Sequence, residues 1–290
     1  MRLASGGGPA SGEGNAPVTQ REEHPAAPSL FLSSSHAPWL APTAVVSGAI
    51  ASGAVSARPD WPLSLAMAAL LALVWVVAWS VIAGVNWSAP LAVWRGWSEG
   101  VPIRALPYAQ PGSDAAYLSR RLGQLRSWLE RDLLPRYGSL LLVGAMAIAV
   151  MAVLSAALGP LAVLLTIAAV CIVQIAVVAC RGNGRPNGLL LGATAVGLPM
   201  LLGYAVFAPL SPGILLVGSG AAAAFAGVRD GWSVLRHAGY ALVVLASLVM
   251  REPVGAFVWA VVWAPQLILG LRRGGYGWLA AGLLAFAVVV

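Results

Sequence analysis

A succession of apolar runs, separated by short polar segments, constrains the fold of this chain more than any other feature. The clear runs are residues 63–84, 138–158, 160–180, 188–208, 213–228, 237–250, 254–271 and 276–290. The longer ones reach the roughly 20 residues that an α-helix needs to cross a bilayer. Only 9% of all residues are charged, against about 25% in soluble domains. The fold class predicted from these features is an all-α integral membrane protein.

The N-terminal part of the chain has a different composition. Residues 1–40 are rich in Gly, Ser, Pro and Ala and are predicted to form a disordered tail, because such a composition cannot build a core. Residues 41–57 form a weaker apolar stretch that Arg58 and Pro59 interrupt. This stretch is either a further span or a re-entrant or surface segment. We therefore expect a transmembrane helical domain over 41–290, a bundle of eight or nine spans.

Arginine is distributed unevenly between alternate loops. One set of loops holds thirteen Arg residues, whereas the intervening loops hold Arg251 alone. The thirteen are Arg95, Arg104, Arg120, Arg121, Arg126, Arg131 and Arg136 in the loop 85–137, and Arg181, Arg185, Arg229, Arg236, Arg272 and Arg273 in later loops. Because basic residues collect in cytoplasmic loops, this set is predicted to be cytoplasmic in a multi-pass protein of the inner (plasma) membrane. The net charge of +7 then gives no reason to expect nucleic acid as a partner.

The loop 85–137 is too long to be a simple connector. Its second half predicts a helix, with Asp114 as candidate N-cap and Pro135 as its end. One face of this helix would carry Leu118, Leu122, Leu125 and Leu129. With arginines on its other faces, it is typical of an amphipathic helix on the inner leaflet. A solvated cap over the bundle and a gate over a substrate entrance are the alternatives.

Two cytoplasmic turns carry candidate binding residues. The first runs from Arg181 through a Gly-rich stretch to Arg185, and its backbone and guanidinium groups could cradle an anion such as diphosphate. The second holds Arg229 and Asp230, the latter being the only Asp in the second half of the chain. An acid at a helix end could join a metal or diphosphate site. The alternatives are a tight turn for the first segment and a structural ion pair for Asp230.

A few polar residues inside the apolar runs bear on function. Gln174 and Gln266 lie within runs, where an unpartnered amide is costly, so each is expected to form an interhelical hydrogen bond. The clear runs hold no carboxylate, which argues against an ion- or proton-coupled transporter. Only His237 lies near a run, which argues against a bis-histidine haem site.

The order of spans and loops resembles that of the UbiA-type intramembrane prenyltransferases. The segment from Arg185 to Tyr204, with a polar turn, a Gly/Ala run, Pro199 and a Gly-Tyr ending, is similar to the helix that follows that family's middle cytoplasmic turn. The stretch Arg104-Ala-Leu-Pro-Tyr is similar to the segment after its first acidic motif. The layout covers residues 41–290, and the likeness in sequence covers 181–232.

The resemblance implies an activity and a set of site residues. Members of the family transfer a prenyl group from a prenyl diphosphate to a membrane-bound acceptor, and Mg²⁺ held by two Asp-rich loop motifs binds the diphosphate. The residues that would contact the diphosphate here are Arg181, Arg185, Arg229 and Asp230. The metal ligands would be Asp230 and Asp114.

The chain departs from the family pattern at these motifs. Asn86 is followed by Trp87 rather than Asp, and Asp230 is the only acid in the second loop. Two functions therefore stay open. The chain is either a divergent prenyltransferase that uses Mg²⁺, or a catalytically degenerate, UbiA-like structural or lipid/quinone-binding subunit of a membrane complex. The partners are membrane lipid or isoprenoid in both cases, with membrane proteins added in the second.

Overall fold

The computed structural model describes residues 37–82, 85, 87–102, 110, 112–179, 187–268 and 275–289, so the predicted tail lies almost wholly outside the described residues. Every regular element in these ranges is helical, which confirms the predicted all-α fold class. The elements are α1 (Ala37–Ala51), η1 (Val55–Ala57), α2 (Trp61–Ile82), α3 (Ser88–Gly96), α4 (Asp114–Trp128), η2 (Leu129–Leu133), α5 (Leu134–Leu158), α6 (Pro160–Ala179), α7 (Gly188–Gly192), η3 (Ala193–Gly197), α8 (Leu198–Phe207), α9 (Pro212–Asp230), α10 (Ser233–Val249), α11 (Pro253–Ile268) and α12 (Gly275–Val289).

Five helical stretches among the described residues are long and apolar enough to cross a membrane. They are α2, α6, α9 and the continuous stretches Asp114–Leu158 and Gly188–Phe207. Helices α1, α10, α11 and α12 supply shorter apolar segments. Each apolar run in the sequence corresponds to one of these nine helical stretches, so the runs were correctly predicted as helices.

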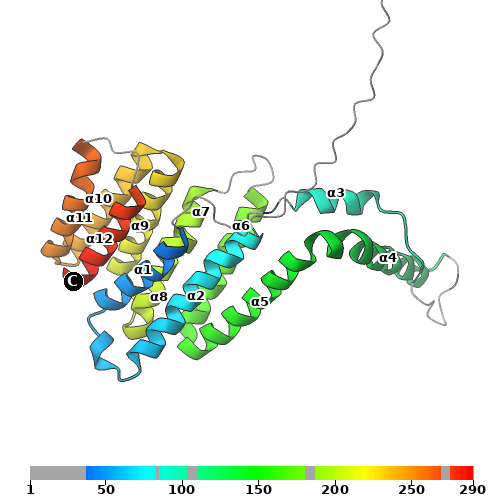
Figure 1. Ribbon diagram of the computed structural model, residues 1–290, viewed down its shortest axis with the longest axis horizontal. Coiled ribbons are helices and arrows are strands. Elements are labelled where there is room, and N and C mark those ends of the chain that lie inside the picture. The colour runs from blue at the N-terminus through cyan, green and yellow to red at the C-terminus, as the bar shows by residue number, and fades with distance from the viewer. Residues whose placement is uncertain are drawn as a thin grey trace, which may run out of the picture.

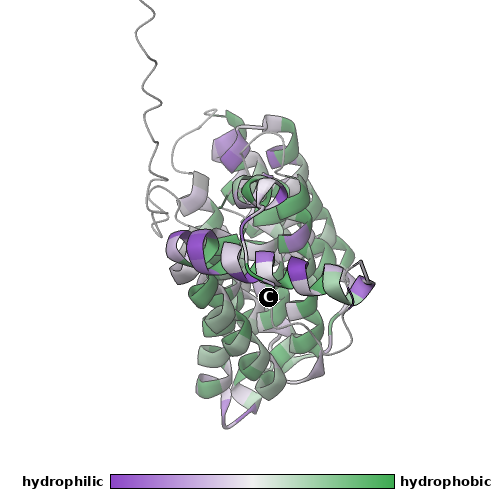
Figure 2. Cartoon of the chain, turned by 90° about the vertical axis from the view of Figure 1, so that its right-hand side faces the viewer, coloured by the Kyte–Doolittle hydropathy of each residue, from purple (hydrophilic) through white to green (hydrophobic). Residues whose placement is uncertain are grey.

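The outer surface of the bundle carries many exposed apolar side chains, as expected of a surface that contacts lipid. On α5, Met146 is 60% exposed and Val153 is 69% exposed, and α6 carries exposed leucine, isoleucine and valine side chains along its length. Hydrophobic residues dominate the bundle helices, and hydrophilic ones gather mainly at turns and on α4 (Figure 2). An apolar face of this extent would be unstable in water, whereas helices with paired backbone groups are stable in hydrocarbon.

Helix α1 lies inside the bundle, where it packs against α8, α12 and α2 (Figure 1). Ala41, Ala44 and Val45 have no exposed surface. Gly48 of α1 and Gly203 of α8 let the two backbones touch, because a Cβ at Gly203 would lie 2.9 Å from the Val45 Cα atom. Small residues allow such close approach between membrane helices. This packing argues against a surface segment for 41–57. The helix ends at Ala51 and is shorter than the five stretches that are long enough to cross a membrane, so the alternatives of a span and a re-entrant segment stay open.

Helices α3 and α4, with residues 97–102 that follow α3, reach out from one side of the bundle as a lateral arm (Figure 1). The arm confirms a helix in the loop 85–137, but its start was misassigned by one residue. Ser113, not Asp114, is the N-cap, because the Ser113 hydroxyl accepts the N–H of Ala116 at 3.3 Å. Asp114 is the first helical residue, where a negative charge still stabilises the helix dipole.

The prediction that Pro135 ends this helix is wrong. The chain stays helical from Asp114 to Leu158 through the π-helical turn η2. In an α-helix, Pro135 would lack the N–H that bonds the Arg131 carbonyl and its ring would clash with that carbonyl. The wider turn over Leu129–Leu133 relieves this conflict, as π-helical insertions do elsewhere.

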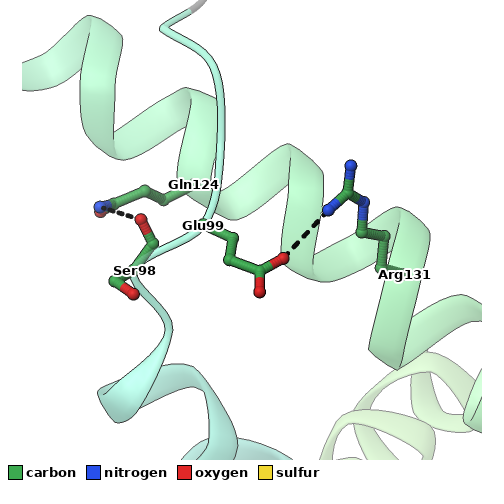
Figure 3. A network of polar contacts seen from close by, with 4 residues as sticks. All are labelled: Ser98, Glu99, Gln124 and Arg131. Atoms are coloured by element: carbon green, nitrogen blue, oxygen red, sulfur yellow. Dashed lines mark hydrogen bonds and ion pairs between the residues drawn. The ribbon is translucent and has the colours of Figure 1, made fainter.

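Contacts between residues far apart in sequence hold the arm together. Glu99 forms an ion pair with Arg131 at 3.0 Å, and the Gln124 amide donates to the Ser98 carbonyl at 3.5 Å (Figure 3). The indole rings of Trp94 and Trp128 lie 5.4 Å apart. The segment that follows α3 is therefore fixed across α4 and η2.

The predicted leucine face of α4 is largely uncovered by protein. Leu118 is 59% exposed and Leu122 is 50% exposed, whereas Leu125 and Leu129 are half-buried. The covered side of α4 instead contains Ser119. The exposed leucines, with arginines on either side, match the pattern of a helix that lies on a membrane surface.

Candidate functional site

Asp230 lies where the end of α9 meets the start of α7. Its Oδ2 atom accepts the backbone N–H of Gly188 at 3.1 Å. Next to it, the Asn187 side chain accepts the N–H of Leu189 at 2.9 Å. Backbone N–H groups at a helix start have no partner within the helix, and a carboxylate there also interacts favourably with the helix dipole. Asp230 thus acts as a cap for the helix that begins at Gly188.

The local sequence on both helices is suited to this contact. A side chain at Gly188 would collide with Asp230, because a Cβ there would lie 2.7 Å from Oδ1. Gly231 follows Asp230 with φ of 72°, a left-handed conformation that ends helices and that glycine adopts without strain. Tyr276 of α12 packs against Phe225 of α9, with ring centroids 5.5 Å apart, so α12 also lies against the C-terminal part of α9.

The predicted site residues are only partly brought together. Asp230 contacts the start of α7, and Arg229 is its neighbour on α9. Arg181 and Arg185 lie outside the described residues. Asp114 begins α4 on the arm, far across the molecule from α9 (Figure 1). The structure therefore does not join Asp114 to Asp230.

The magnesium site implied by the resemblance can be compared with the side chains present. Among the described residues no group of three or more His, Cys, Asp or Glu side chains could hold a metal ion. Magnesium prefers an octahedral set of oxygen ligands, of which carboxylates supply one or two beside substrate phosphates and water. Asp230 offers one carboxylate, and Gly188 already donates to it. The described residues do not fit a two-metal site.

A pocket lies between α2, α5 and α6. Its cavity volume is about 40 Å³. It is lined by Trp75, Ala78 and Ile82 of α2, Ile148 and Met151 of α5, and Ala169, Val170, Val173 and Gln174 of α6. Apart from the Gln174 amide and the Trp75 indole N–H, these side chains are apolar. Ligand pockets commonly combine such walls with a few polar groups.

The two glutamines within helices have different surroundings. The prediction for Gln266 is confirmed: its amide nitrogen donates to the Tyr240 hydroxyl at 2.8 Å, which links α11 to α10. Gln174 does not follow the prediction. Its side chain is exposed on α6 and lines the pocket, and no hydrogen bond to another described residue involves it. Sequence reasoning marked Gln174 as unusual but gave no sign of the pocket.

Trp75 is the other side chain of the pocket wall that carries a polar atom. It is 1% exposed, and its indole nitrogen has no hydrogen-bond partner among the described residues. A buried donor without a partner is unfavourable by roughly 1–3 kcal/mol. Because this nitrogen has essentially no accessible surface, the amide of Gln174 is the polar group that the pocket presents.

Comparison of the chain with protein-family models, with curated proteins and with solved structures returned no match. The proposed function therefore rests on the sequence and the structure of this chain.

Proposed function

We propose that this chain is a UbiA-like protein of the inner membrane with nine spans, which binds an isoprenoid or other lipid without transferring a prenyl group and serves as a subunit of a membrane complex. The observation that carries the proposal is the position of Asp230. The only acid of the second loop holds the start of α7 through the Gly188 N–H. A structural carboxylate in that place is compatible with a retained fold and a lost metal site.

The chemistry of prenyl transfer explains why this matters. A diphosphate leaving group carries several negative charges, which metal ions neutralise while an allylic cation develops. Holding those ions requires carboxylates near the diphosphate. Among the described residues, Asp230 belongs to no group of three or more His, Cys, Asp or Glu side chains that could hold a metal ion.

A prenyltransferase is the second candidate, and one observation favours it. Asp230 accepts the N–H of Gly188, one residue after the point at which the chain that contains Arg181 and Arg185 in sequence enters the described range, and Arg229 precedes Asp230 on α9. Arginine forks bind phosphate oxygens in pairs of hydrogen bonds.

Binding of geranylgeranyl diphosphate to the detergent-purified full chain separates the two candidates. A ligand that binds the native state raises the melting temperature by mass action, with about 2.7 kcal/mol of stabilisation at 100 times Kd. The proposal expects no magnesium-dependent shift. A magnesium-dependent shift that is lost in Asp230→Asn and kept in Asp60→Asn, an acid on a turn before α2, would establish the enzyme instead.

The subunit role has its own test. Purification of the chain from its native membrane in a mild detergent is expected to bring membrane-protein partners with it in fixed stoichiometry. Recovery of the chain alone at every detergent strength would contradict this part of the proposal.

A further inference from the structure

We infer that helix α4 docks on the leaflet that α5 enters, where Arg121 and Arg126 bind phosphates of anionic phospholipids on either side of a leucine row. The leucine row consists of Leu118, Leu122 and Leu125 of α4. This inference goes beyond the proposed function, because it concerns the arm and not the interior of the bundle. It is independent of which of the two candidate functions the bundle has.

The leucine row lies on the open side of α4. Leu118 and Leu122 are at least half exposed. The residues that follow α3 cover a different side of the helix, since a Cβ at Gly123 would lie 2.9 Å from the Val101 carbonyl carbon. At 3.6 residues per turn, Gly123 points roughly 130° away from the centre of the leucine row. The chain thus closes one side of α4 and leaves the apolar side open.

The connection to α5 makes lipid the occupant of the open side. Helix α4 continues through η2 into α5 without a break, and it turns sideways from the upper end of α5 (Figure 1). The first turns of α5 already expose Leu134 and Leu142, as a lipid-facing span does. A helix joined in this way to a span lies at the membrane surface. There an amphipathic helix places its apolar side at the boundary between headgroups and acyl chains.

Two arginines flank the leucine row. On a helical wheel, Arg121 and Arg126 lie roughly 70° to either side of the centre of the row, whereas Arg120 lies roughly 170° from it. Asp114 is the only acid of α4, against three arginines. Apolar side chains with a cation along each edge complement an anionic membrane surface, because the long arginine side chains reach the phosphates while the leucines contact the acyl chains.

The surroundings of both guanidinium groups leave them able to bind phosphate. The Arg121 Nε atom donates to the Tyr117 hydroxyl at 3.1 Å and its Nη1 atom to the Gln124 Oε1 atom at 3.5 Å, and both partners are neutral. Arg126 pairs with Glu130 at 2.7 Å, and both side chains of this pair are exposed. An exposed ion pair contributes little, whereas a guanidinium group binds phosphate oxygens through paired hydrogen bonds.

The test places a nitroxide on either side of the arm in the full chain. Cys171 and Cys180 are replaced by alanine, and the nitroxide is attached at Leu122→Cys on the leucine row or at Ser98→Cys on the segment that crosses α4 (Figure 3). The protein is reconstituted in nanodiscs of dioleoyl phosphatidylcholine, with or without about 30% dioleoyl phosphatidylglycerol as the anionic lipid. Collision of the nitroxide with oxygen, which concentrates in lipid, is compared with collision with nickel-EDDA, which stays in water.

The nitroxide on Leu122→Cys is expected to collide mainly with oxygen, and the nitroxide on Ser98→Cys mainly with nickel-EDDA. With phosphatidylglycerol present, Arg121→Gln is expected to lower the ratio of docked to undocked arm about fivefold, which is the effect of one basic residue at an anionic surface. Arg120→Gln is the matched control, because it removes the same charge from the opposite side of the same helix. It is expected to change the ratio by less than about twofold, since salt screens the more distant charge.

Three results would overturn the inference. Nickel-EDDA collision as frequent at Leu122→Cys as at Ser98→Cys would show that the leucine row lies in water. Protection of Leu122→Cys from both reagents would show that protein, such as a second copy of this chain, covers the row. Equal effects of Arg120→Gln and Arg121→Gln would show a general attraction between charges without the phosphate contact.

Discussion

The contact between α1 and α8 gives a sharp prediction for Gly203→Ala. A Cβ at residue 203 would lie 2.8 Å from the Val45 carbonyl carbon and still closer to its oxygen. Ordinary contacts of this kind begin at 3.4 Å. The carbonyl carbon alone requires a shift of about 0.6 Å, and the closer oxygen requires more than about 1 Å, so the helices must separate by more than about 1 Å. Neither atom belongs to a flexible side chain that could move aside, because both are backbone atoms of α1.

The magnitude follows from the packing that this separation removes. A gap of 0.5–1 Å forfeits a quarter to a half of the dispersion energy between facing atoms, and overpacking of well-packed interiors costs about 1–3 kcal/mol. Alanine is a better helix former than glycine by about 1 kcal/mol, which offsets part of the loss. Gly203→Ala is therefore expected to lower the free energy of unfolding by about 1–2 kcal/mol.

Gly144→Ala is the matched control within a span. A Cβ at residue 144 meets only the Val81 Cγ1 atom, at 3.9 Å. This variant therefore gains helix propensity without a clash, and its free energy of unfolding is expected to rise by up to about 1 kcal/mol. The assay is reversible unfolding in mixed micelles with increasing SDS, followed by far-ultraviolet circular dichroism. If Gly203→Ala proves as stable as Gly144→Ala, α1 does not pack against α8 as described.

Three further predictions concern single polar contacts. Asp230→Ala is expected to lower unfolding stability in the same assay by about 1–2 kcal/mol, because the start of α7 loses its cap, and a neutral effect would contradict that role. Tyr240→Phe is expected to lower the free energy of unfolding by about 1–2 kcal/mol, because buried Gln266 loses its partner. Adding Gln266→Met should restore part of this stability, and a double variant less stable than Tyr240→Phe alone would refute the argument. The exposed Glu99–Arg131 pair is expected to show a coupling of about 0.2–1 kcal/mol in a double-mutant cycle that fades in 1 M salt; a coupling that resists salt would count against an exposed pair.

The helices were predictable from the sequence because apolar runs are local signals. Each run became a helix, and the arm helix was found from its leucine spacing. The prediction was wrong at the two ends of the arm helix, which depend on single residues rather than on the hydrophobic pattern. Ser113 displaced Asp114 as the cap, and η2 carried the helix past Pro135. A π-helical turn leaves no mark in a hydrophobic pattern, so this continuity could not be anticipated.

The candidate site was much less predictable, because its contacts join distant parts of the chain. Asp230 was recognised as unusual, but its partner Gly188 lies 42 positions earlier, and no local pattern connects them. Gln174 and Gln266 look alike in sequence, each a lone amide in an apolar run. Packing alone decides that Gln266 meets Tyr240 and that Gln174 faces a pocket built by three helices.

The continuity of the chain from Asp114 to Leu158 has a mechanical consequence. Because η2 joins α4 to α5 without a break and the Glu99–Arg131 and Trp94–Trp128 contacts brace the bend, the two helices act as one lever, in which the 25 residues of α5 form the longer part and the arm forms the shorter part. Helix α4 has 15 residues, or about 22 Å. A 10° change in the tilt of α5 would therefore sweep the tip of the arm by about 4 Å, which converts a small movement among lipids into a displacement at the membrane surface.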